Sequence, residues 1–265
     1  MGFYKDFLVR ISGNAFMQRL FAKQALALNH AMGIGTSGNF SSDGEFIVFN
    51  LLRENCQPPY CIFDVGSNKG QFLEYVLRDM AQSNFNIHCF EPSQETFRML
   101  AANSPENDKI TLNNIGLGKE NCEAVLHFSE SGDEGASLTK RDLRHYGINT
   151  DHSETVRLAT LDDYCFTHGI EHIHLLKLDI EGHELDALSG AMTMIIGNKI
   201  DIILFEFGGC NIDTRRFFRD YWHFFEDTPM DIFRATPSGY LIKLEKYKED
   251  IEQFCYSNFV ALRRA

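Results

Sequence analysis

The sequence predicts an α/β protein of the Rossmann-like class: a seven-stranded, mostly parallel sheet with an antiparallel last strand and helices on both faces. Short apolar runs alternate with longer segments whose apolar residues recur at helical spacing. A buried strand, a glycine-containing loop and a helix follow one another at residues 61–80, and three later strands also end in polar or acidic residues. Strands near the C-terminus are joined by a hairpin turn, which indicates an antiparallel edge.

The chain of 265 residues carries 37 acidic and 25 basic residues, a net charge of −12. This excess of acid argues against nucleic acid as a partner, because binding to a polyanion draws most of its affinity from Lys and Arg. The seven cysteines form no Cys-x-x-Cys pair. We expect them to be reduced thiols, which favours a cytoplasmic location. No segment approaches the roughly 20 apolar residues of a membrane span, so we expect no stable membrane insertion.

Residues 1–43 are expected to form an N-terminal helical extension, and residues 44–265 the main domain. Between residues 3 and 32 apolar side chains recur at helical spacing, which predicts one or two amphipathic helices. We interpret the extension as a lid packed on the main domain. A membrane-surface helix or a dimerisation helix are the alternatives, and the second would make the protein a homo-oligomer.

The central motif is the stretch 61–70, in which a strand ends at Asp64 and glycines follow at Gly66 and Gly70. A strand, a glycine loop and a helix present backbone N–H groups to a nucleotide-like ligand. The spacing Gly-x-x-x-Gly differs from the Gly-x-Gly-x-x-Gly loop that binds pyrophosphate. The loop also begins with a carboxylate, which suits a ligand with a cationic amino group. These features favour S-adenosylmethionine (SAM) as the cofactor.

Later strand ends extend the predicted cofactor site. Glu91 ends the next strand, where a carboxylate can accept hydrogen bonds from both ribose hydroxyls, although the nicotinamide-binding fold uses an acid in the same place. Asn114 follows the third strand, where adenine is expected. The polar segment 129–155, which contains Ser137, is too long for a plain connection. We interpret it as a substrate-facing lid, with a solvated loop as the alternative.

A second concentration of reactive side chains follows the fourth strand, at Asp179, Glu181 and His183, and Glu206 follows the fifth. Because the carboxyl ends of parallel strands line one crevice, these four candidate catalytic residues should border the same pocket. Crowded carboxylates and a histidine can act as acids or bases, since burial and like charges move their pKa values toward neutrality. No Cys/His cluster has metal-ligand spacing, so no metal site is expected, although the three acids could offer oxygen ligands.

Taken together and in order, the motifs resemble the FkbM-type SAM-dependent methyltransferases over about residues 44–260. The blocks that carry the resemblance are Gly44-Glu45, F-D-V-G-S-N-K-G (63–70), F-E-P-S-Q-E-T-F (90–97), N-N-I-G-L-G (113–118), T-L-D-D-Y (160–164), L-K-L-D-I-E-G-H-E (176–184) and F-E-F-G (205–208). The resemblance implies O-methylation of a hydroxyl on a sugar or another acceptor, commonly a bacterial surface glycan, a glycolipid sugar or a secondary metabolite.

The resemblance also implies roles for individual residues. The residues that would bind SAM are Asp64, Gly66, Asn68 and Gly70 at its methionine part, Glu91 at the ribose and Asn114 by the adenine, with Glu45, Ser67, Pro92, Ser93, Ser137 and Asp179 beside them. Asp179, Glu181 and Glu206 would face the acceptor. His183 stands where the family often has a small residue, and it could supply the base.

Two hypotheses that assign the protein to other functional classes remain as alternatives. A nicotinamide-dependent dehydrogenase is disfavoured because the second glycine needed for close approach of a pyrophosphate is missing. A non-catalytic binding protein with the same fold is disfavoured because Asp64, Glu91 and Asp179 are all present.

Overall fold

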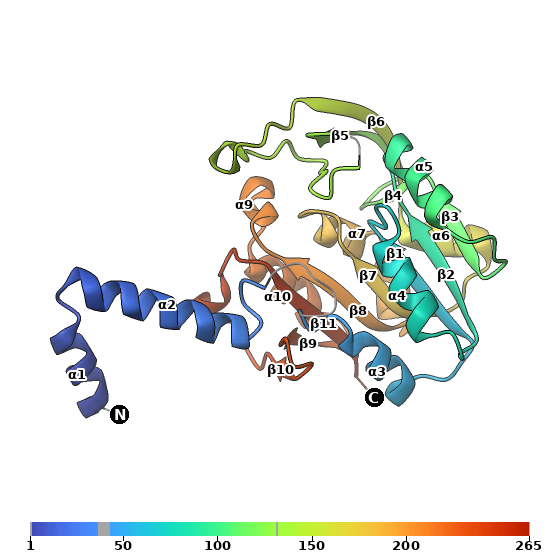
Figure 1. The fold of residues 1–265 in the computed structure, drawn as a ribbon. Coiled ribbons are helices and arrows are strands. Elements are labelled where there is room, and N and C mark those ends of the chain that lie inside the picture. Colours follow the sequence, from blue (N-terminus) through green and yellow to red (C-terminus); the bar gives the residue numbers. More distant parts are fainter. Residues whose placement is uncertain (1, 37–42, 131, 265) are drawn as a thin grey trace.

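The computed structural model describes residues 2–36, 43–130 and 132–264. A mixed eight-stranded sheet lies between two layers of helices (Figure 1). Its strands, in spatial order, are β3 (Ile110–Asn113), β2 (Phe85–Phe90), β1 (Tyr60–Val65), β7 (Ile173–Leu178), β8 (Ile200–Phe207), β11 (Ser257–Arg263), β9 (Met230–Ala235) and β10 (Leu241–Lys243).

The strands from β3 to β8 are parallel, and β11 runs antiparallel to both β8 and β9. The prediction of a mostly parallel sheet with an antiparallel last strand is therefore confirmed. The sheet has eight strands, one more than the seven expected, and the expected hairpin turn after Thr236 pairs β10 with β9. The central parallel strands β1, β7 and β8 are almost wholly buried, which explains their short, continuous apolar runs.

Each face of the sheet carries its own apolar core. One face is covered by α3 (Ile47–Asn55), α4 (Gln71–Asp79) and α5 (Gln94–Asn103). The other face is covered by α6 (Leu161–His168), α7 (Glu184–Ser189), α8 (Met192–Ile196) and α10 (Phe218–Glu226). Three aromatic residues of α10, Phe218, Tyr221 and Phe225, are all buried, so this aromatic stripe is part of the core.

A separate sheet of three strands joins β4 (Gly116–Leu117), β6 (His152–Ala159) and β5 (Cys122–Phe128). The prediction that residues 152–155 belong to the long polar loop was wrong, because they are part of β6. The strand β6 escaped notice because only Val156 in it is buried, so it shows no apolar alternation. The remaining short elements are α9 (Cys210–Thr214), η1 (Arg144–Tyr146) and η2 (Glu249–Ile251).

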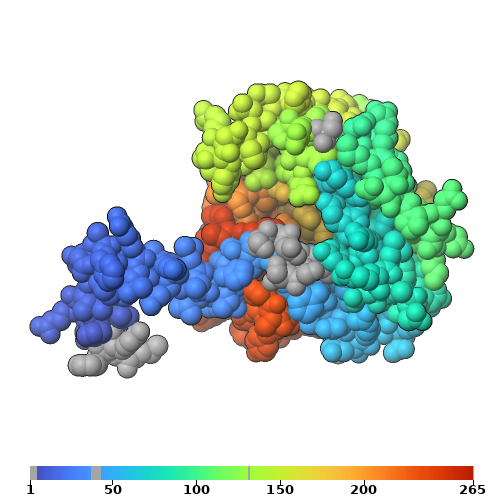
Figure 2. Space-filling view, viewed as in Figure 1, coloured from blue at the N-terminus to red at the C-terminus, as the bar shows by residue number. Residues whose placement is uncertain are grey.

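The N-terminal extension forms the two expected helices, α1 (Gly2–Ile11) and α2 (Ala15–Ala31). They project from the main domain as an arm (Figures 1 and 2), and α2 has no buried residue. The arm does not line the cavity described below, so its role as a lid stays a prediction. No helix in the described ranges is both long and apolar enough to cross a bilayer.

Contact with the main domain begins at Gly33, where a Cβ would lie 2.0 Å from the carbonyl oxygen of Ala235. Ile34 is buried, and the backbone N–H groups of Gly35 and Thr36 donate to the carbonyl of Tyr256. Residues 33–36, which the sequence analysis placed in the extension, therefore pack on the main domain. Residues 37–42 of that extension lie outside the described residues.

Candidate active site

A cavity of about 580 Å³ opens at the carboxyl ends of β1, β2, β7 and β8, the edge at which ligands bind in open α/β sheets. Its volume is in the usual range for a small-molecule site. The sequence-predicted residues that line it are Glu45, Gly66, Ser67, Asn68, Glu91, Pro92, Ser137, Asp179, Glu181, His183 and Glu206. Four others, Asp64, Gly70, Ser93 and Asn114, do not line it.

Gly66 sits where three strand ends meet. Its φ is +83°, and a Cβ there would lie 1.8 Å from the carbonyl oxygen of Asp179, so this position accepts only glycine. The N–H groups of Gly66 and Ser67 both donate to the carbonyl of Phe90. The backbone N–H of Asp179 donates to the carbonyl of Val65. These contacts hold the ends of β1, β2 and β7 together and bring Asp179 beside the glycine loop.

Glu91 presents a carboxylate to the cavity at the end of β2. Its two oxygens accept hydrogen bonds from the backbone N–H groups of Asn68 at 3.0 Å and Ser93 at 2.9 Å. Burial raises the pKa of Glu91 to about 7, although the two backbone donors lower it. A carboxylate has about four lone-pair sites. Glu91 therefore keeps acceptor capacity for a diol such as a ribose.

Asn114 supports the turn that carries Glu91. Its amide donates to the carbonyl oxygens of Glu91 at 3.0 Å and Pro92 at 3.1 Å. Ser93 caps α5, with its side chain accepting from the N–H of Thr96, and Gly70 occupies the N-cap of α4 with φ +98°. These three predicted residues therefore support the backbone around the cavity and do not line it.

Lys177 is a cavity residue that the sequence analysis missed. Its Nζ lies 2.9 Å from Oδ2 of Asp179 and 3.7 Å from Oδ1 of Asp64. Burial lowers the pKa of Lys177, but the attraction of Asp179, Asp64 and Glu45 outweighs this effect and raises it overall. A lysine within the apolar run of β7 was the available signal, since a lysine is almost never fully buried unless it is paired.

Asp64 lies behind the cavity wall, with its side chain wholly buried. Neither carboxylate oxygen has a hydrogen-bond partner in the described parts of the chain, and burial raises the pKa of the group. Its position beneath Lys177 indicates that Asp64 holds this lysine in place. The opposite charges of Lys177 and Asp179 then stand side by side at the cavity, an arrangement that complements an ammonium and a carboxylate on one ligand.

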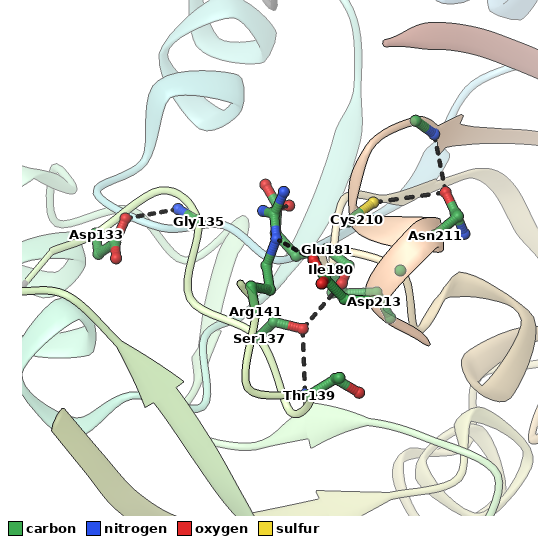
Figure 3. Close-up of polar contacts among 12 residues, drawn as sticks. Asp133, Gly135, Ser137, Thr139, Arg141, Ile180, Glu181, Cys210, Asn211 and Asp213 are labelled. Atoms are coloured by element: carbon green, nitrogen blue, oxygen red, sulfur yellow. Dashed lines mark hydrogen bonds and ion pairs between the residues drawn. The ribbon is translucent and has the colours of Figure 1, made fainter. Parts of the chain in front are cut away.

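The segment after β5 is attached to the turn after β7 (Figure 3). Arg141 Nη1 lies 2.5 Å from Oε2 of Glu181, and its Nε lies 3.6 Å from Oδ2 of Asp213. Ser137 donates from its hydroxyl to the carbonyl of Glu181 at 2.9 Å. Burial raises the pKa of Glu181 to about 8, although Arg141 lowers it.

His183 uses both ring nitrogens. Its Nδ1 lies 3.0 Å from Oδ2 of Asp186, and its Nε2 lies 3.1 Å from the hydroxyl of Thr139. Because an ionised carboxylate only accepts, the Asp186 contact places a proton on Nδ1, and in the neutral imidazole Nε2 then accepts from Thr139. Arg216 donates to the other oxygen of Asp186 at 2.9 Å.

Glu184 is a structural acid. One of its oxygens accepts from the N–H groups of Ile180 and Gly182, both at 3.1 Å, and the other accepts from the hydroxyl of Tyr221 at 3.1 Å. The aromatic stripe of α10 is thereby connected to the turn that carries Asp179 and Glu181.

Tyr256 is the second cavity residue that the sequence analysis missed. Its hydroxyl lies 2.9 Å from Oε1 of Glu45 and 2.5 Å from Oε1 of Glu206. The amide of Asn258 donates to the same oxygen of Glu45 at 3.1 Å. Burial raises the pKa values of Glu45 and Glu206, and burial together with the two carboxylates raises that of Tyr256. The antiparallel register of β11, with Asn258 opposite Glu206, creates this contact.

A different cluster lies at the opposite edge of the sheet, where β7 and β8 begin. His172, His174 and Asp201 come together there, although they are not spaced as a metal motif in the sequence. Asp201 already pairs with His172 at 2.7 Å and with Arg263 at 2.9 Å, and Nδ1 of His174 accepts from the N–H of Cys61. The cluster is therefore satisfied by protein partners.

The fold and the crevice define a class, the α/β proteins that bind a nucleoside-containing cofactor at the carboxyl ends of their strands. Residues 64–228 match the family described as the methyltransferase FkbM domain. The chain belongs to this family of SAM-dependent methyltransferases, which confirms the resemblance found in the sequence and SAM as the family's cofactor.

Of two curated relatives, one is named for a hexuronic acid and the other for transfer to a 2-O position. The chain is 26% identical over 147 residues to the hexuronic acid methyltransferase AglP of Haloferax volcanii, a match that covers 56% of each chain. It is 29% identical over 157 residues to the 2-O-methyltransferase NoeI of Sinorhizobium fredii, covering 54% of this chain and 60% of the relative. The chain thus spans a little over half the length of each relative.

Among solved structures, a methyltransferase FkbM from Methylobacillus flagellatus is similar, with 14% identity and a TM-score of 0.44. The match covers 94% of this chain and 60% of that one. The family assignment rests on the match at residues 64–228.

Proposed function

We propose that this protein transfers a methyl group from SAM to a hydroxyl group of a sugar or glycan precursor. The observation that carries the proposal is the shared cavity, which is lined by the Glu91 carboxyl group, with acceptor capacity for a diol, and by carboxyl groups at Asp179, Glu181 and Glu206. Family membership supports SAM as the methyl donor.

The residues around β1, β2 and β7 fit the cofactor. Glu91 retains acceptor capacity for the ribose hydroxyls, and the Lys177–Asp179 pair matches the carboxylate and ammonium of the methionine part. Gly66 keeps the loop close to Asp179, where a side chain would clash. When bound, SAM supplies an electrophilic methyl group.

The other end of the cavity suits a hydroxyl acceptor. Much of the acceleration in such a transfer comes from holding two reactants in line, and the wall contributed by residues 133–138 helps to enclose them. A hydroxyl must also lose its proton as its oxygen is methylated, and a positioned base contributes about 10²–10⁴-fold. Asp179, Glu181, His183 and Glu206 all border the space where that proton would leave.

A sugar hydroxyl is the acceptor favoured by the relatives, because one is named as a hexuronic acid methyltransferase and the other as a 2-O-methyltransferase. A small secondary metabolite with a hydroxyl group is the competing acceptor class, and the methyl-transfer assay described below distinguishes the two.

Isothermal titration with S-adenosylhomocysteine, repeated with NAD and with a chelator present, tests the cofactor. We expect binding of S-adenosylhomocysteine that survives the chelator, and no binding of NAD. Glu91→Gln should weaken this binding by about 1–3 kcal/mol, the usual cost of unpairing buried polar groups. The matched variant Glu95→Gln, at an exposed acid on α5, should leave it unchanged.

Transfer of a labelled methyl group then tests the acceptor, with methyl hexopyranosides, nucleotide-sugars and hydroxylated aromatic compounds offered separately. Labelling of a sugar supports the proposal. Labelling of the aromatic compounds alone would assign the protein to metabolite methylation instead, and binding of NAD without S-adenosylhomocysteine would overturn both.

A further inference from the structure

We propose that Tyr256 relays the proton of the acceptor hydroxyl from Glu206 to Glu45. The inference rests on the proposed function, because it concerns the base in that reaction. It starts from a geometric fact: the hydroxyl of Tyr256 contacts one oxygen from each of two cavity-lining carboxyl groups.

The other candidate bases are already occupied. Asp179 is paired with Lys177 at 2.9 Å, and Glu181 is paired with Arg141 at 2.5 Å. A neighbouring cation stabilises the charged form of a carboxylate and makes it a weaker base. The basic nitrogen of His183 already accepts a hydrogen bond from Thr139.

Glu206 differs from these groups in its partner. The hydrogen-bond partner of its carboxyl group within the described chain is the neutral hydroxyl of Tyr256, at Oε1. Its strongest electrostatic neighbours are the acids Asp179 and Glu45. Unlike Asp179 and Glu181, Glu206 therefore has a side-chain partner without positive charge, an environment that favours the protonated form of a carboxyl group.

Counting protons shows how the three groups are connected. A phenol has one hydrogen, so Tyr256 can donate to only one of its two carboxyl partners. The second contact needs a proton on a carboxyl group. The arrangement is therefore an ionised Glu45 that accepts from Tyr256, while Tyr256 accepts from a protonated Glu206. The three groups hold two protons and one negative charge.

The same arrangement can take up one more proton. The acceptor hydroxyl donates its proton to the free oxygen of Glu206, the proton on Oε1 of Glu206 moves to Tyr256, and the proton of Tyr256 moves to Glu45. The acceptor oxygen keeps the electron pair of its O–H bond and forms the new bond to the methyl carbon, while the pair of the broken carbon–sulfur bond stays on the sulfur. The three groups end with three protons and no net charge.

Infrared spectroscopy tests the proton count without any turnover. In the wild-type minus Glu206→Gln difference spectrum at neutral pH, we expect the loss of a protonated carboxyl band. The matched variant Glu134→Gln, at an exposed acid on the cavity rim, should lose a carboxylate band instead. Loss of a carboxylate band in Glu206→Gln would overturn the relay, whatever the turnover of the enzyme.

Kinetics test the transfer step with whichever acceptor the labelled-methyl assay identifies. Tyr256→Phe keeps the ring but removes the hydroxyl, so kcat should fall by about 10²-fold or more, while the Kd for S-adenosylhomocysteine stays within about threefold. Tyr240→Phe, at an exposed tyrosine, should retain wild-type kcat. His183→Ala should lower kcat by less than about tenfold, because its nitrogens are engaged elsewhere.

The outcomes separate the two proposals. An unchanged kcat in Tyr256→Phe overturns the relay and leaves the methyl transfer intact. An absence of transfer by the wild type to every hydroxyl acceptor overturns the proposed function, and the infrared result then still decides whether Glu206 holds a proton.

Discussion

The Nζ atom of Lys177 lies 3.7 Å from Oδ1 of Asp64, a wholly buried carboxylate with no hydrogen-bond partner in the described chain. The same ammonium contacts Asp179 at 2.9 Å on the cavity side. One lysine thus balances an acid inside the sheet and an acid at the site. We therefore expect both stability and ligand binding to depend on this side chain.

Replacing Lys177 with methionine should reduce the free energy of unfolding by about 3–5 kcal/mol, because Asp64 is left as an uncompensated buried charge. Urea denaturation measures the loss. The control Lys243→Met breaks a solvent-accessible pair with Asp231 and should have a much smaller effect, because solvent screens such pairs. Equal losses in the two variants would show that Asp64 does not rely on Lys177.

Gly66→Ala should unfold the protein more readily than Gly147→Ala, although both glycines have a positive φ. At Gly147 nothing lies within 4 Å of the added Cβ. The expected cost is therefore only that of holding alanine in a left-handed backbone conformation, about 1–2 kcal/mol. At Gly66 the Cβ would lie 1.8 Å from the carbonyl oxygen of Asp179, and the strand ends must separate. The difference between the two variants in urea denaturation measures that clash. If the two costs are the same, the strand ends are not packed as described.

Glu91 should make stability depend on pH. Its folded-state pKa of about 7 lies above the ordinary value of 4.5, so the folded state binds this proton more tightly than the unfolded state. The stabilisation that this proton gives to the folded state is fully present below pH 4.5 and is lost as the pH rises through about 7. The loss amounts to at most about 3 kcal/mol.

Urea denaturation of Glu91→Gln across this pH interval should show a smaller decline in the free energy of unfolding than the wild type. Glu95→Gln, which alters an exposed acid in the first turn of α5, should retain the wild-type decline in the free energy of unfolding. A wild-type slope in Glu91→Gln would mean that Glu91 keeps an ordinary pKa.

Removing residues 1–32 should leave the main domain as stable as before, because α2 has no buried residue. The melting temperature and the affinity for S-adenosylhomocysteine should both be unchanged. Removing residues 1–36 is the matched control, since it also takes away buried Ile34 and the two N–H donors to the carbonyl of Tyr256. That longer deletion should lower the melting temperature. A loss of stability in the shorter deletion would indicate that the arm packs on the domain in solution.

The strands that the sequence predicts well are those with a continuous apolar run and a clear end. The strand Ile173–Leu178 and the helix Leu161–His168 begin where the sequence changes character, because an apolar run or the Thr160 cap stands there. Glu206 was expected to follow the fifth strand, but β8 runs to Phe207, so Glu206 lies within it. Local pattern determines these elements, and they place most of the predicted acids around one cavity.

The features that the sequence did not predict depend on contacts distant along the chain. Tyr256 meets Glu45 across 211 positions of sequence, and the antiparallel register of β11 beside β8 brings Glu206 to the same hydroxyl. Lys177 appears as an interruption of an apolar strand until Asp64 and Asp179 are seen around it. Asn114 was expected beside the ligand, but its amide is directed at the backbone of the neighbouring turn.

The position of β11 between β8 and β9 has a consequence for synthesis on the ribosome. Residues 257–263 insert between two strands that are made earlier, so β8 and β9 each keep an unpaired edge until this segment has left the exit tunnel. Folding of this half of the sheet must therefore wait until β11 has emerged from the ribosome. Nascent chains stalled before this segment should depend on chaperones to keep those two edges from pairing with other chains.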